Sequence, residues 1–262
     1  MTNLRSALWA EFLKARRSLV PWLAGLGLSL APIVGGLFMI ILKDPDRARS
    51  MGLISTKAQL TGGVADWPSF FSMQTQAIAV GGAMLFAIMT AWEFGREFSD
   101  HTAKDLLAIQ TSRSATVSAK FIIIAFWVVV VTLWIEVLGL IVGAIVVLPG
   151  WSIPLVAGAM SQILAAACLG LALMPPVAFF ASAGRGYLTP VGWAFLTLAL
   201  AQVAAVLGWG SWFPWSVPAL FSEMVGPRTS QLGVHSYVLV LLTCTAGLAA
   251  TFAWWIRADH TR

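Results

Sequence analysis

The chain has 262 residues, of which 59% are hydrophobic and only 10% are charged, and its formal net charge is +5. This composition excludes an ordinary water-soluble globular domain. The basic residues lie beside apolar runs, so we expect them to meet a membrane surface rather than nucleic acid. Cys168 and Cys244 lie within apolar runs without CxxC spacing, which predicts buried small side chains and neither a disulfide nor a metal site.

Residues 1–18 are predicted to form an amphipathic helix that lies in the membrane interface. Its apolar residues recur at helical spacing: Leu4, Leu8, Trp9, Phe12 and Leu13. Its polar and basic residues are Arg5, Glu11, Lys14, Arg16 and Arg17. Such a helix suits an anionic leaflet. The alternative is that it only extends the first spanning helix.

Six apolar segments are long enough to cross a hydrocarbon core about 30 Å thick. They cover residues 19–42, 73–92, 121–148, 153–181, 188–207 and 237–256. The first run lacks a small-residue cleavage site, so we expect a membrane anchor and not a cleaved signal peptide. Pro175 and Pro176 interrupt the fourth run. The sequence therefore predicts an all-α integral membrane protein with a single transmembrane domain.

The charge distribution predicts the topology. With six spans both termini lie on one side, and that side carries 11 Lys and Arg residues against 5 on the other. The positive-inside rule then places the termini and residues 93–120 on the cytosolic side of the membrane. We expect this membrane to be a bacterial cell (inner) membrane. The connectors 43–70 and 208–236 lie on the outer face. Three tryptophans in the second connector predict short helices at the headgroup level: Trp209, Trp212 and Trp215.

Motifs for catalysis or nucleotide binding are missing. The sequence has no P-loop, no GxSxG and no HExxH, and its three histidines are far apart in the chain. We therefore expect no catalytic residue and no metal site here, and any energy for transport must come from another chain.

Residues 93–120 form a charged island between the second and third spans. Thr102 and Asp105 have the spacing of a capping box, which predicts a short helix. Leu106 and Leu107 offer an apolar knob, and a charged rim is expected from Glu97, Asp100 and Lys104. The alternative is a solvated loop whose leucines pack on the protein's own helix ends.

This island resembles the cytosolic loop of ABC-2-type ABC transporter permeases, which read roughly E-x-x-x-G-T-x-x-x-L-L-x-x-P-x-S-R with a later lysine. The matching residues are Glu97, Thr102, Leu106, Leu107, Ser112, Arg113 and Lys120. His101 stands where glycine is usual and Gln110 where proline is usual.

The resemblance implies a permease subunit of a drug, bacitracin-like or lantibiotic-immunity exporter. Two permease subunits, identical or related, would pair with two cytosolic ATPases. The short coupling helix in the loop would dock on an ATPase. This chain would hold no cofactor and would not be an enzyme, while ATP and Mg would bind the partner ATPase.

Glu136 is the only charge inside an expected span. A buried carboxylate in a membrane faces the helix bundle or water, so Glu136 is a candidate residue of the substrate path. The alternative is an interhelical hydrogen bond with Thr132, Gln162 or Gln202. Two other functions stay open: a membrane scaffold or sensor partner of an ATPase, and, less favoured with one charged residue in the spans, an intramembrane enzyme.

Overall fold

The computed structural model describes residues 2–44, 63–100, 102, 111–222 and 232–257. Within these residues every regular element is a helix, and six helical segments are long and apolar enough to cross a membrane. The predicted fold class, an all-α membrane protein with six spans, is therefore confirmed.

The first three spanning segments are α2 (Val20–Lys43), a bent segment of three helices, and α7 (Arg113–Val146). The bent segment consists of α4 (Trp67–Ala77), a π-helical turn η1 (Ile78–Gly82) and α5 (Ala83–Ser99). An additional helix, α1 (Thr2–Arg17), precedes them and packs mainly on α7.

The other spanning segments are α8 (Ile153–Ala172) continued by α9 (Met174–Ala183), α10 (Leu188–Val206) and α12 (Val234–Arg257). In the described part of the connector after α10, residues 207–222, three short helices form, as the tryptophans predicted: η2 (Gly210–Trp212), η3 (Pro214–Ser216) and α11 (Val217–Phe221). Trp209 and Trp212 in this region are exposed.

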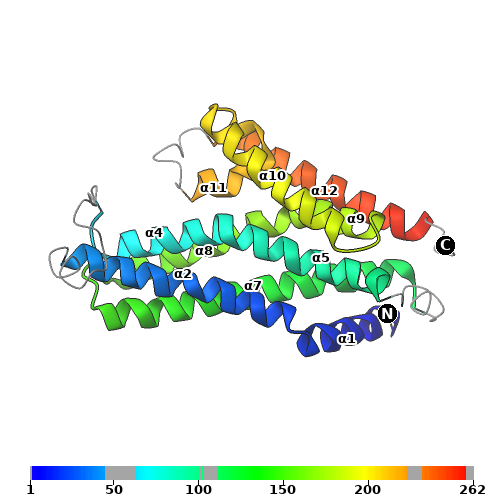
Figure 1. Ribbon diagram of the computed structural model, residues 1–262, viewed down its shortest axis with the longest axis horizontal. Helices are drawn as coiled ribbons and strands as arrows, with labels where there is room; N and C mark the ends of the chain where they lie inside the picture. Colours follow the sequence, from blue (N-terminus) through cyan, green and yellow to red (C-terminus); the bar gives the residue numbers. More distant parts are fainter. Residues whose placement is uncertain (1, 45–62, 101, 103–110, 223–231, 258–262) are drawn as a thin grey trace.

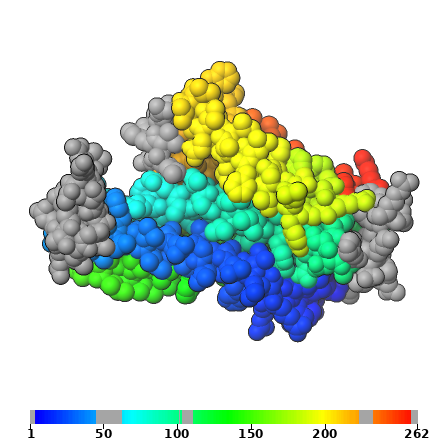
Figure 2. Space-filling model, viewed as in Figure 1, coloured from blue at the N-terminus to red at the C-terminus, as the bar shows by residue number. Residues whose placement is uncertain are grey.

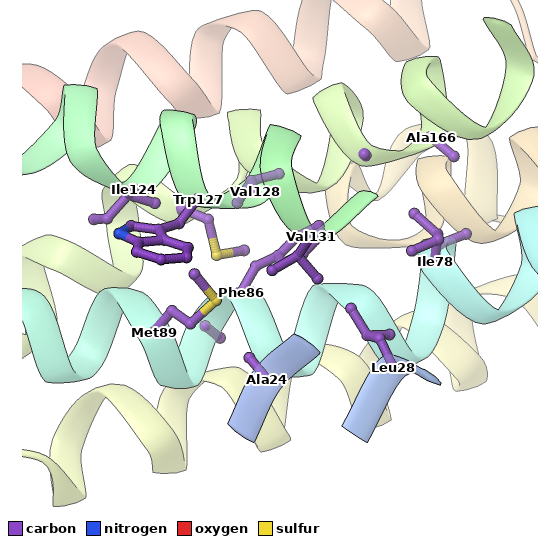
Figure 3. Packing of buried hydrophobic residues seen from close by; sticks show 14 of the residues in the cluster. Ala24, Leu28, Ile78, Phe86, Met89, Ile124, Trp127, Val128, Val131 and Ala166 are labelled. Carbon is purple, nitrogen blue, oxygen red and sulfur yellow. The ribbon is translucent and has the colours of Figure 1, made fainter. Parts of the chain in front are cut away.

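The helices form an elongated bundle. In Figure 1, α2, α4–α5 and α7 run along the long axis, and α10 and α12 cross obliquely above them. The start of α1 and the end of α12 lie at the same end of the bundle, where α5 also ends and α7 begins. The core runs through the bundle and contains residues of α2, α5, α7, α8 and α9. Between α5 and α7, Phe86 and Met89 face Trp127 and Val131 (Figure 3).

Two of the spanning segments begin well before their apolar runs. Helix α7 begins at Arg113, whereas the apolar run begins at Phe121, because Ser112 caps it by accepting a hydrogen bond from the Ala115 amide at 3.3 Å. Likewise Asp66 caps α4 by accepting from the Ser69 amide at 2.9 Å. Capping residues stabilise a helix start before its apolar residues begin.

The break at Pro175 and Pro176 lies inside the bundle. Both prolines are buried in the first turn of α9, and the Thr251 hydroxyl of α12 lies 3.4 Å from the Pro175 carbonyl oxygen. A Cβ atom at Gly247 would collide with the backbone of these prolines. The glycine therefore allows α12 to approach the broken helix closely.

Two local predictions were wrong. Cys168 is exposed and Cys244 is half-buried, because both lie on helix faces that point out of the bundle; both are free thiols. Glu11 was expected among the polar residues of α1, but it is buried between helices. The face of α1 that packs on the bundle thus contains Ala7, Glu11 and Ala15, while Trp9 is exposed.

Candidate functional site

A cluster of buried charges lies where the segment between α5 and α7 leaves the bundle. Its centre is Lys120 on α7, which is 0% exposed. The Lys120 ammonium lies 2.6 Å from Glu97 Oε1 on α5 and 3.4 Å from Glu11 Oε2 on α1. It also donates a hydrogen bond to the Glu93 carbonyl oxygen at 2.7 Å, and the Glu93 carboxylate is 3.9 Å away. One lysine therefore joins three helices.

A second lysine closes the cluster from the side of α1. Lys14 lies 2.9 Å from Glu11 Oε1 and 3.2 Å from Glu97 Oε1. Burial alone would raise the pKa of Glu11, but the charges of Lys120 and Lys14 outweigh it and hold the pKa below its ordinary value. We call Glu11, Lys14, Glu93, Glu97 and Lys120 the buried charge cluster.

Buried ions are costly unless they are paired and hydrogen-bonded, so a cluster of this kind fixes the relative positions of the helices that carry it. Here the geometry holds α1, the end of α5 and the start of α7 in one arrangement. The end of α5 at Glu97 and the start of α7 at Lys120 are therefore held side by side.

The residues expected to contact the ATPase differ in their exposure: some are exposed, one is buried, and four lie outside the described residues. Asp100 and Thr102 are exposed, and the Thr102 amide donates to the Glu97 carbonyl oxygen at 2.9 Å. Glu97 is only 2% exposed, because its carboxylate pairs with Lys120 inside the protein. It therefore does not belong to an exposed charged rim, contrary to the expectation. Four expected residues lie outside the described residues: Lys104, Asp105, Leu106 and Leu107.

At the other side of the segment, Ser112 and Arg113 begin α7. Ser112 is exposed and caps α7. The Arg113 guanidinium donates to the carbonyl oxygens of Trp255 and Ile256, at 3.2 Å and 3.3 Å. These carbonyls belong to the last turn of α12, where unpaired acceptors favour a cation. Arg113 thus connects the segment to the last spanning helix.

Glu136 lies in α7 and is only 2% exposed. Within the described part of the chain, its Oε1 atom has no hydrogen-bond partner. Gln74 on α4 is also buried, and both polar atoms of its amide lack a partner there. This amide packs against Gly139, one turn after Glu136. Gln74 therefore lies against α7 close to the turn that carries Glu136.

The roles of Glu11, Glu93 and Lys120 in this cluster were not among the predictions from the sequence. A signal was present for Glu93 and Lys120, because each lies at the edge of an apolar run, where a charged residue can turn inward. Glu11 had no such signal, because it lies inside the amphipathic segment 1–18. The pairing itself connects residues 109 positions apart, in the case of Glu11 and Lys120, and such a pair shows only in the folded chain.

The fold and the site define a multi-pass helical membrane protein. A buried ion pair joins its second and third spans where the charged segment 93–120 connects them. A family model described as "ABC-2 family transporter protein" matches residues 7–202. The chain therefore belongs to this family and is an ABC-2-type transporter permease, as the resemblance of the connecting segment indicated. Membership implies, in general, a partner ATPase and a partner permease.

A relative supports the same assignment. The bacitracin transport permease protein BCRB of Bacillus licheniformis is 26% identical over 179 residues, which cover 68% of this chain and 85% of the relative. Both the family and this relative are transport permeases, which agrees with a role other than enzyme.

Proposed function

We propose that this chain is the transmembrane subunit of an ATP-driven exporter and that residues 97–113 receive the motion of a separate cytosolic ATPase. The observation that carries the proposal is the buried charge cluster. It joins Glu97 before the segment to Lys120 after it, at 2.6 Å. A force applied to the segment would therefore act on α5, α7 and α1 together, since rigid spans transmit such motion across a membrane.

Orientation and partners follow from this proposal. The end of the bundle with both termini lies on the cytosolic side of the bacterial inner membrane. The ATPase binds ATP and Mg on that side. Leu106 and Leu107 insert into the ATPase, with Asp100, Lys104 and Asp105 around them. Arg113 passes the motion to α12 through its bonds to the last carbonyls of that helix. A second permease subunit, identical or related, completes the path.

The substrate is an amphipathic molecule that crosses between two permease subunits. The name of the relative, a bacitracin transport permease, makes a peptide antibiotic the first candidate, and a drug or a lipid-like molecule is next. Glu136 supplies a buried polar group along the path, with Gln74 nearby, because its Oε1 atom is unpaired among the described residues. An unpaired buried carboxylate can bind a cationic or hydrogen-bonding group.

The docking proposal is tested by Leu106→Asp and Leu107→Asp. Either charge would enter the apolar centre of the interface, where a few buried residues supply most of the binding energy. We expect each variant to insert in the membrane and to lose co-purification with the ATPase. Ser114→Asp is the matched control, because Ser114 is exposed at the start of α7, and it should retain the ATPase. Unchanged co-purification of both leucine variants would refute docking.

The substrate proposal has a separate test. We expect ATP hydrolysis by the purified complex to rise when bacitracin is added, and not when a charged peptide of similar size without apolar side chains is added. No response to any amphipathic peptide or drug would contradict the substrate class while leaving the docking result unaffected.

A further inference from the structure

A cavity of about 640 Å³ lies between α1 and α5. On α1 its lining residues follow one face of the helix and the residue after it: Ala10, Leu13, Lys14, Arg17 and Ser18. On α5 and at the residue that follows it they are spaced four residues apart: Trp92, Arg96 and Asp100. Tyr187, before α10, completes the lining. Figure 2 shows α1, in dark blue, beneath the green end of α5, with the yellow start of α10 coming down beside it.

The charges of this cavity favour an anion. Lys14, Arg17 and Arg96 face one acidic residue, Asp100. Lys14 is already paired with Glu11 and Glu97. No salt bridge to Arg17 or Arg96 forms within the part of the chain that the structure describes. Two guanidinium groups therefore remain for a ligand, and guanidinium matches the geometry of phosphate oxygens.

One of these groups is held in place. The Arg96 guanidinium lies over the ring of Trp92, 4.8 Å from the ring centroid. Such a cation–π contact restricts a long side chain without neutralising its charge. Arg17, in contrast, is exposed at the last turn of α1 and can adjust to a ligand.

The level of the cavity matches lipid headgroups. Arg17 ends α1 three residues before α2 enters the membrane, and Arg96 follows the apolar run of the second span. Trp92 and Tyr187 are the aromatic types found at membrane interfaces. Just after Ser18, the side chains of Leu19 and Trp22 are exposed and offer an apolar surface for an acyl chain.

We propose that this cavity binds the phosphodiester headgroup of an anionic membrane lipid, with Arg17 and Arg96 on the phosphate and Trp92 and Tyr187 beside the headgroup. The bound lipid links α1 to α5 beside the buried charge cluster, since Lys14 belongs to both the cluster and the cavity lining. The proposal requires only that the chain lies in a membrane, so it stands whether or not the segment 97–113 docks on an ATPase.

The test is native mass spectrometry of the full-length protein in detergent, with phosphatidylglycerol or phosphatidylcholine added at equal concentration. We expect the wild type to retain phosphatidylglycerol in preference. Arg17→Gln and Arg96→Gln should each weaken this binding about fivefold, the effect of one basic residue near an anionic surface. Arg16→Gln is the matched control, because Arg16 is an exposed neighbour outside the cavity lining, and it should bind like the wild type.

Three results would overturn the proposal. Equal retention of the two lipids would show no preference for an anionic headgroup. An equal loss in Arg16→Gln would show attraction by surface charge alone. Displacement of the lipid by millimolar inorganic phosphate would show that the site takes soluble phosphate. If Arg96→Gln does not fold, Arg17→Gln decides, since this exposed side chain can be changed without disturbing the core.

Discussion

Lys120 and Glu97 lie 23 residues apart in the sequence, and their side chains meet at 2.6 Å with almost no exposure to solvent. The pair stands at the base of the connecting segment, one residue near the end of α5 and the other in the third turn of α7. Because Glu11 of α1 contacts the same ammonium, the three helices α1, α5 and α7 meet at Lys120.

Lys120→Met should destabilise the protein by about 3 to 5 kcal/mol, because it leaves buried carboxylates without their cation. Thermal unfolding in detergent measures the loss. Adding Glu11→Gln and Glu97→Gln to Lys120→Met removes the uncompensated charge, so this triple variant should recover much of the stability. If Lys120→Met alone were as stable as the wild type, the cluster would not stabilise the fold as described.

Arg113→Gln should loosen the last turn of α12 by about 1 kcal/mol, the effect of a cation at a helix C-terminus. Hydrogen exchange of residues 250–257 should then become faster. Ser112→Ala is the control: it removes the cap of α7, at a cost of about 1 kcal/mol, and should leave exchange in α12 unchanged. Equal exchange in α12 for Arg113→Gln and wild type would show that the bonds to Trp255 and Ile256 contribute nothing.

Gly247→Ala should lower stability by roughly 1 to 3 kcal/mol, since the added methyl group meets the backbone of Pro175 and Pro176. The matched change Gly192→Ala on α10 meets no atom within 4 Å and should be neutral or slightly stabilising. Thermal unfolding of the two variants side by side provides the comparison. If both behave alike, the close approach of α12 to the proline break is not required.

The six spans could be predicted from the sequence because the length of an apolar run by itself decides whether a helix can cross a membrane. The helix starts at Trp67 and Arg113 could not, since local caps at Asp66 and Ser112 extend the helices beyond those runs. The buried charge cluster could not be predicted from the sequence for a different reason. Lys120 resembles any lysine at a membrane edge until α1 folds against α7 and brings Glu11 beside it.

Glu136→Gln should reduce transport without reducing assembly, because it removes the charge and keeps the shape and hydrogen-bonding capacity of the side chain. Transport into vesicles measures the first effect, and gel filtration of the complex measures the second. Export at the wild-type rate would favour the other reading of Glu136, in which it only makes a hydrogen bond between helices.

The most direct test of the coupling role is ATP-driven transport by the complex carrying Glu97→Gln. The glutamine keeps a hydrogen-bond acceptor for Lys120 but removes the charge that binds α5 to α7 and α1. We expect the ATPase to remain bound and to hydrolyse ATP, while transport per ATP falls at least about fivefold, the lower range of coupling energies between sites. Wild-type transport by this variant would contradict the account, because the segment would then act without the buried pair at its base.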